Sequence, residues 1–180
     1  MGRSLNVTLP LLLLASCDGM LIGQRLVEPD AEAKVPHLPL REGQQLVASC
    51  GASKGYSYFP RIGMVSEEES GFTEDTIRDG HFYVVKGADD SYDLIFKDAS
   101  RERHSAVGEG AVVQKLRGGR SDSAFAVFYL SGARSVELYT FYKEDDGKLR
   151  FTNLVSKGGD ALIAKSGILV GPCEHLAIEL

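Results

Sequence analysis

A serine set between two glycines is the first feature of this sequence that could do chemistry. Gly51-Ala52-Ser53-Lys54-Gly55 fits G-x-S-x-G, a pattern in which hydrolases hold a nucleophilic serine on a sharp turn between a strand and a helix. Such a site also needs an acid and a later histidine, and three histidines follow: His81, His104 and His175. The residues after the motif, Tyr56 to Pro60, favour instead a strand that then stops. We therefore expect Ser53 to be a loop serine, with a small serine hydrolase as the alternative.

Metal-binding residue types are present but scattered. The histidines, together with His37, lack H-x-x-x-H or C-x-x-C spacing and a carboxylate pair beside them, so no metal site is predicted. Asp89-Asp90 and Asp145-Asp146-Gly147 lack the twelve-residue pattern of a calcium loop. Both are typical of hairpin turns, where Asp suits the early positions and Gly can take a positive φ. The sequence indicates no cofactor.

Aromatic side chains are the remaining candidates for a binding role. Most should fill the core of a small β domain. The segment from Ser135 to Tyr142, however, carries large residues on both faces, so some of them are left to line a cavity or a contact patch. Tyr139 and Phe141 are the candidate binding residues, and Leu138 with Tyr142 is the alternative pair.

The elements that must position these residues are short β-type runs from Gln45 onward, separated by Gly, Asp and Ser. Their spacing is that of hairpins in a barrel or a sandwich. We predict an all-β domain, an antiparallel meander closed as a small barrel or as a two-sheet sandwich. The expected strands are Gln45–Cys50, Tyr56–Phe59, His81–Lys86, Tyr92–Lys97, Arg103–Val107, Ala111–Leu116, Ala124–Leu130, Ser135–Tyr142, Lys148–Val155 and Gly167–Val170.

Two of the three cysteines are expected to form a disulfide. Cys50 ends the first expected strand, Cys173 follows the last, and Cys17 belongs to a different part of the chain. In an oxidising compartment the pair that remains should form a bridge. The alternative is two buried free thiols in a cytosolic protein.

The N-terminus predicts export. Arg3 precedes an apolar run from Leu5 to Leu14 that is too short to cross a membrane. Leu14-Ala15-Ser16-Cys17 follows and resembles the lipobox of bacterial lipoproteins, which implies a lipid on Cys17. Plain secretion, or a start codon at Met20, is the alternative. The predicted organisation is a signal peptide over 1–17, a proline-containing tether over 18–44 and a β domain over 45–180.

Composition and charge narrow the classes of partner. The 180 residues are 43% hydrophobic, and the formal net charge is −5, values typical of a single globular domain. Lys and Arg are dispersed among more numerous acids, so no basic face is available to neutralise phosphates. No nucleic-acid partner is predicted, and a membrane is expected to be contacted only through the N-terminal lipid.

Two stretches resemble a set of small exported bacterial proteins with a C-G-x-S-x-G-Y-x-Y type motif. One is Cys50 to Tyr58, and the other runs from Glu137 through Gly147-Lys148-Leu149 to Asp160. The resemblance implies an extracytoplasmic β domain and supplies no catalytic residue. Ser131-Gly132-Ala133-Arg134 is similar to part of the inhibitory loop of periplasmic lysozyme inhibitors, which implies inhibition of a lysozyme-like enzyme as a further alternative.

The leading hypothesis is a non-catalytic binding module of the cell envelope. Its partner is an envelope protein or a small apolar ligand. A ligand-carrying barrel is one version of this hypothesis, and it predicts a dry internal cavity.

Overall fold

The computed structural model describes residues 38, 40–97, 102–116, 118, 122–131 and 134–177. This part of the chain contains strands and turns but no helix, and therefore no helix long and apolar enough to cross a membrane. The predicted all-β class is confirmed. The strands are β1 (Gln45–Cys50), β2 (Ser53–Phe59), β3 (Gly71–Ile77), β4 (His81–Lys86), β5 (Tyr92–Lys97), β6 (Arg103–Ser105), β7 (Ala111–Lys115), β8 (Asp122–Tyr129), β9 (Ser135–Lys143), β10 (Leu149–Lys157) and β11 (Lys165–Leu176).

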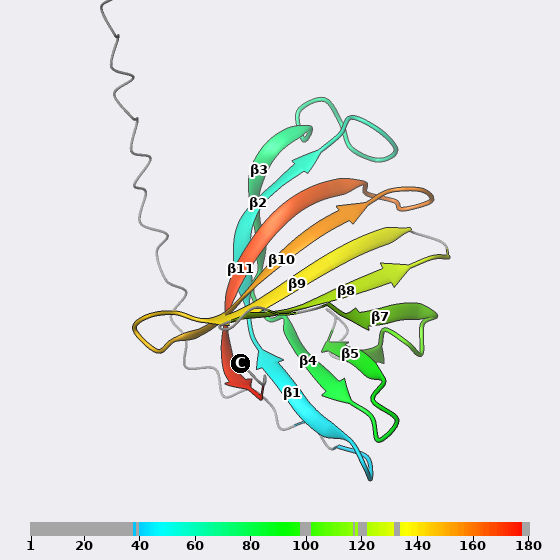
Figure 1. Ribbon diagram of the computed structural model, residues 1–180. Helices are drawn as coiled ribbons and strands as arrows, with labels where there is room; N and C mark the ends of the chain where they lie inside the picture. Colours follow the sequence, from blue (N-terminus) through cyan, green and yellow to red (C-terminus); the bar gives the residue numbers. More distant parts are fainter. Residues whose placement is uncertain are drawn as a thin grey trace, which may run out of the picture.

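Antiparallel pairing joins all the strands into one curled sheet (Figure 1). The order along the main path is β6-β5-β4-β1-β11-β10-β9-β8-β7. The long strand β11 is where the sheet branches. One of its edges pairs with β10, while the other pairs first with β2 and then with β1. The hairpin of β2 and β3 thus extends the sheet beside β11.

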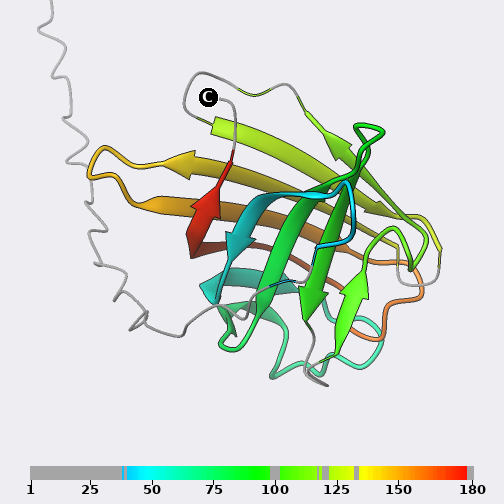
Figure 2. The same cartoon turned by 90° about the horizontal axis from the view of Figure 1, so that it is seen from below.

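The curl makes the two halves of the sheet face each other. The broad group β8 to β11 arches over β1, β4 and β5, as Figures 1 and 2 show. The two ends of the strand path meet where β6 runs into β7 through a tight turn, in which the amide of Ala106 donates to the carbonyl of Leu94 and the amide of Ala111 to that of Ala106. The result is a half-barrel with a concave inner face, which agrees with the predicted barrel-like closure.

The core fills one part of this concave face. Alternate residues of each strand point inward, so that Phe125 of β8, Phe141 of β9 and Val84 of β4 are fully buried. The predicted disulfide is confirmed: Cys50 of β1 and Cys173 of β11 lie directly opposite each other and are bonded. The bridge locks β1 onto β11 at the point where β11 changes partner from β2 to β1.

The structure corrects several predictions about individual elements. Ser53 is not a loop residue, because β2 begins at Ser53 and runs through the glycine that follows. Cys173 does not follow the last strand, because β11 continues to Leu176. The strand β3 was not predicted: its sequence, GFTEDTI, has polar residues on both faces, and it lies exposed at the edge of the sheet. The apolar residues on both faces of Ala124–Leu130 predict a strand buried on both sides, but β8 is so buried only in its middle, and Leu130 is exposed.

Candidate functional site

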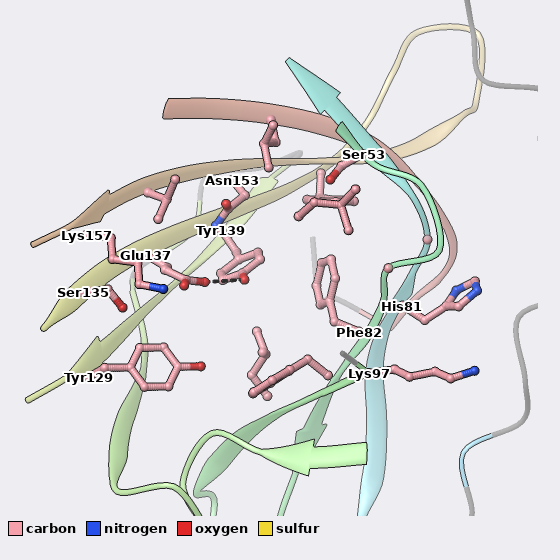
Figure 3. A pocket seen from close by; sticks show the side chains of 18 of the residues that line it. Ser53, His81, Phe82, Lys97, Tyr129, Ser135, Glu137, Tyr139, Asn153 and Lys157 are labelled. Carbon is pink, nitrogen blue, oxygen red and sulfur yellow. Dashed lines mark hydrogen bonds between the residues drawn. The ribbon is translucent and has the colours of Figure 1, made fainter. Parts of the chain in front are cut away.

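A cavity of about 420 Å³ opens on the concave face beside the core (Figure 3). It lies toward the end of the half-barrel where β5, β8 and β10 finish and where β4, β9 and β11 begin, and it reaches the start of β2 and the end of β3. Its volume falls within the range of about 300–1,000 Å³ that is usual for small-molecule sites. The cavity is therefore the candidate functional site.

Strands β9 and β10 supply the polar wall of this cavity. Ser135, Glu137 and Tyr139 alternate along β9 and point inward, and Asn153 and Lys157 do the same on β10. The register places Tyr139 directly opposite Asn153, and Ser135 directly opposite Lys157. Because directly opposite side chains in an antiparallel pair lie within about 5 Å of each other at Cβ, these groups form one continuous patch.

The opposite wall is apolar. Leu94 and Phe96 of β5 and Phe82 of β4 face the polar patch across the cavity. The ring of Phe82 packs edge-on against Phe151 of β10 with 4.7 Å between centroids, and it lies 5.0 Å from the ring of Tyr139. Such offset aromatic contacts stabilise a fixed wall. A molecule in the cavity therefore meets rigid apolar surface on one side and polar groups on the other.

Glu137 and Tyr139 form a hydrogen-bonded pair within the polar patch. The Tyr139 hydroxyl donates to Oε2 of Glu137 over 2.6 Å. Burial raises the pKa of Glu137, and the hydrogen bond from Tyr139 together with the charges of Lys157 and Lys165 only partly offsets that effect. Burial likewise raises the pKa of Tyr139, which keeps its hydroxyl protonated as the donor. A half-buried carboxyl group with a raised pKa, facing a cavity, is a common sign of a functional site.

Two lysines stand at the rim of the polar patch. Lys157 of β10 and Lys165 of β11 are directly opposite each other in the register. The Lys165 ammonium donates to Oδ2 of Asp75 over 2.7 Å, and the Ser57 hydroxyl donates to the same oxygen over 2.7 Å. Burial raises the pKa of Asp75, but the contacts with Lys165 and Ser57 outweigh it, so the pKa lies below its usual value. Lys157 has no ion-pair partner among the described residues.

An amide group of the wall lacks a partner. Asn153 is 7% exposed, and its Nδ2 is buried without a hydrogen-bond acceptor among the described residues. Figure 3 shows the amide directed from β10 toward the Glu137–Tyr139 pair. Leaving a buried donor unsatisfied costs roughly 1–3 kcal/mol. Asn153 is thus a donor available to a ligand that brings an acceptor oxygen.

The predicted binding residues take different positions. Tyr139 lies in the cavity wall. Phe141, two residues further along β9, is fully buried in the core beside Phe125, with 5.8 Å between ring centroids. Phe141 thus supports the wall from behind.

Ser53 also lies in the cavity wall, but without the geometry of a nucleophile elbow. It is 5% exposed at the start of β2, and β2 leads through a loop into strand β3 rather than into a helix. His81 also borders the cavity, but its ring points away from the cavity centre (Figure 3), and its buried Nδ1 has no hydrogen-bond partner among the described residues. Burial and the charge of Lys97 lower the pKa of His81. Ser53 is therefore not paired with His81.

The second glycine of the motif has a packing role. A Cβ at Gly55 would overlap the backbone carbonyl of Ile168 on the neighbouring strand, and a Cβ at Gly167 would overlap the side chain of Ser57. These glycines let β2 approach β11 closely. The second glycine of G-x-S-x-G is thus required by strand packing.

Several predicted features fall outside the described residues. The signal region, Cys17 and most of the 18–44 tether are among them, as are Gly132 and Ala133 of the stretch that resembles an inhibitory loop. In the part that is described, no three His, Cys, Asp or Glu side chains gather closely enough to hold a metal ion.

Sequence reasoning named Tyr139 but missed Glu137, Asn153 and Lys157. One signal was available. Glu137 shares the inward face of β9 with Tyr139 and Phe141, and a charged residue on an otherwise aromatic face is unusual for a strand that only fills a core.

Comparison with known proteins identifies no relative of this chain. No protein-family model matches the chain, and neither a curated protein nor a solved structure shows significant similarity to it.

Proposed function

We propose that this protein is a non-catalytic binding protein of the bacterial cell envelope that takes a small amphipathic molecule into its concave cavity. The observation that carries the proposal is the cavity itself, in which a fixed aromatic wall faces a patch of buried polar groups. Sites for small molecules have this composition, mostly apolar with a few placed polar groups. Tyr139 belongs to both walls, through its ring contact with Phe82 and its hydrogen bond to Glu137.

The envelope location is the second part of the proposal. The disulfide between Cys50 and Cys173 is consistent with folding in an oxidising compartment. The apolar leader and the lipobox-like end of the 1–17 segment support export and a lipid anchor on Cys17. The chain would then hold its binding domain on the far side of the inner membrane by the 18–44 tether.

The binding function is tested with N-phenyl-1-naphthylamine, an uncharged dye that fluoresces in apolar sites. The wild-type protein should give a saturable rise in fluorescence. Val155→Phe should weaken dye binding about tenfold or more, because the larger ring occupies the cavity. Leu154→Phe is the matched control, since Leu154 lies on the same strand but is exposed on the outer face. A wild-type protein that does not bind the dye, or a folded Val155→Phe variant that binds it equally well, contradicts the proposal.

The anchor is tested in cells with an alkyne-tagged palmitate. Wild-type protein should take up the tag and fractionate with membranes. Cys17→Ser should lose the tag and leave the membrane fraction, while Cys50 and Cys173 remain bonded. Labelling that is unchanged in Cys17→Ser contradicts the lipid anchor and leaves the cavity proposal to its own test.

A further inference from the structure

The two lysines at the rim of the cavity place like charges at neighbouring positions of the sheet. Lys157 and Lys165 face each other directly across β10 and β11, and like charges at directly opposite positions destabilise a sheet. Of the two lysines, only Lys165 has an ion-pair partner among the described residues, Asp75 of β3. Strand β2 lies between β11 and β3, so this ion pair directs the Lys165 ammonium away from Lys157. Glu137 is near enough to be affected by both lysine charges, and an anion beside Lys157 would supply the direct counter-charge that Asp75 supplies to Lys165.

The neighbouring groups are also donors. Ser135 lies directly opposite Lys157, and the amide of Asn153 is buried, unpartnered and directed into the cavity. The one carboxyl group of this patch, Glu137, already accepts the hydroxyl of Tyr139. The Lys157 ammonium has no ion-pair partner and the buried Asn153 Nδ2 has no acceptor among the described residues, and an acceptor group in the cavity would satisfy both.

We infer that the ligand is a small amphipathic carboxylic acid, whose carboxylate lies against Lys157 and Asn153 while its apolar part covers Phe82 and Phe151. This inference rests on the proposed function and names the ligand class for the same cavity. A singly charged head group suits the site better than a phosphate, because Lys165 is already engaged with Asp75 and Glu137 stands beside the anion.

Glu137 gives this site a pH dependence. The groups that face its carboxyl are Tyr139 on its own strand, Tyr129 on β8, Lys157 on β10 and Lys165 on β11, with Glu109 of the turn before β7 also at the cavity. Burial already favours the protonated form of Glu137, and a bound carboxylate would favour it further. Binding should therefore take up a proton and strengthen as the pH falls from neutral toward the pKa of Glu137.

The experiment measures displacement of N-phenyl-1-naphthylamine from the wild-type protein by decanoate, decanol and decylamine. These probes share one chain length and differ in the charge of the head group. Decanoate should bind about tenfold or more tightly than the other two, the value of one charge-assisted hydrogen bond. Lys157→Gln and Asn153→Leu should each weaken decanoate binding and leave decanol binding unchanged.

Two further variants complete the design. Glu137→Gln should tighten decanoate binding at neutral pH and remove its pH dependence, because the neutral amide keeps an acceptor for Tyr139 but carries no charge. Lys97→Gln is the matched control for Lys157, since Lys97 borders the cavity but points away from its centre (Figure 3); it should bind decanoate as the wild type does.

The outcomes separate this inference from the function on which it rests. If the wild-type protein binds the dye but decylamine or decanol displaces it best, the carboxylate assignment is wrong and the proposed binding function still stands. Unchanged decanoate binding in Lys157→Gln, or weaker decanoate binding in Glu137→Gln, also overturns it. Absence of dye binding to wild-type protein overturns both.

Discussion

At the scale of single residues, burial of the Glu137 carboxylate costs the fold stability. Its carboxyl group is hydrogen-bonded to Tyr139 at the cavity wall, and Glu137 lies directly opposite Val155 of β10; burial there disfavours the charged form. Natural proteins usually avoid such positions unless function requires them. The stability of the protein should therefore improve when the charge is removed.

Glu137→Gln tests this cost. The pKa of Glu137 is raised in the folded state above its value of about 4.3 in an unfolded chain. Its ionisation therefore reduces stability as the pH rises above that value. The variant should unfold at a higher temperature than wild type at neutral pH, and the difference should disappear at about pH 4 and below. Thermal unfolding of both proteins across this pH range measures the difference in unfolding temperature, and Glu42→Gln at an exposed position is the control. A constant difference at all pH values contradicts the assignment to Glu137.

The charge of Asp75 has the opposite effect on stability, because it stabilises the fold. Its folded pKa lies below the unfolded value of about 3.9, so the Lys165–Asp75 bridge stabilises the fold above that pH and is lost as the pH falls through the folded pKa. Asp75→Asn should lower the free energy of unfolding by about 1–3 kcal/mol at neutral pH, and the deficit should shrink in acid. Urea unfolding measures it, with the adjacent exposed Glu74→Gln as the control. A deficit equally large in acid would assign the effect to packing.

At the scale of elements, close packing of β2 on β11 decides where the hairpin of β2 and β3 lies. Gly55 and Gly167 permit this approach because their missing side chains leave room for the backbone and for Ser57. Strand β3 contacts the sheet only through β2. Loss of the β2–β11 contact should therefore release both strands, together with the Asp75 anchor.

Gly55→Ala tests this contact. The added methyl group would overlap the Ile168 carbonyl, and overpacking of this kind costs about 1–3 kcal/mol. Amide hydrogen exchange should show β2 and β3 losing protection while β8 and β9 keep theirs. Gly158→Ala is the matched control, because nothing lies within 4 Å of a Cβ at that position. Uniform protection in Gly55→Ala contradicts a separate role for this hairpin.

The sequence predicts elements well where local signals are strong. The bounds of β1, β4 and β5 agree with the expected strands, because turn residues flank short β-type runs. Strand β3 was not predicted, because it lies exposed at the sheet edge and its polar and apolar residues do not alternate. Strand β11 was expected only over Gly167–Val170. It runs from Lys165 to Leu176 and contains Gly171 and Pro172, two residue types that disfavour strands.

The site was predictable only in part. Tyr139 could be proposed because one strand carried more aromatic residues than a core needs. The grouping of Asn153 and Lys157 with it depends on register, and the facing wall of Phe82 depends on how the sheet curls. Neither property is encoded in a short stretch of sequence, because both follow from pairings between distant strands.

At the scale of the whole molecule, the disulfide should account for a large share of stability. Cys50 and Cys173 are 123 residues apart, and closing so long a loop in the unfolded chain is worth roughly 4–5 kcal/mol from loop-closure entropy alone. Cys50→Ala/Cys173→Ala should lower the free energy of unfolding by about this amount in urea. Reduced wild-type protein should behave like the double variant. A loss below about 1 kcal/mol contradicts the expectation.

The position of β11 has a consequence for how the protein is made. This strand pairs with β10, β1 and β2, yet it is translated after all of them. Under the export proposed above, residues 165–176 would cross the membrane after the other strands, and β1 and the β2–β3 hairpin could pair with β11 only then. Until then Cys50 lacks its partner thiol, and the unpaired strand edges are prone to aggregate. A product that stops before β11 should leave no folded remnant and should be degraded.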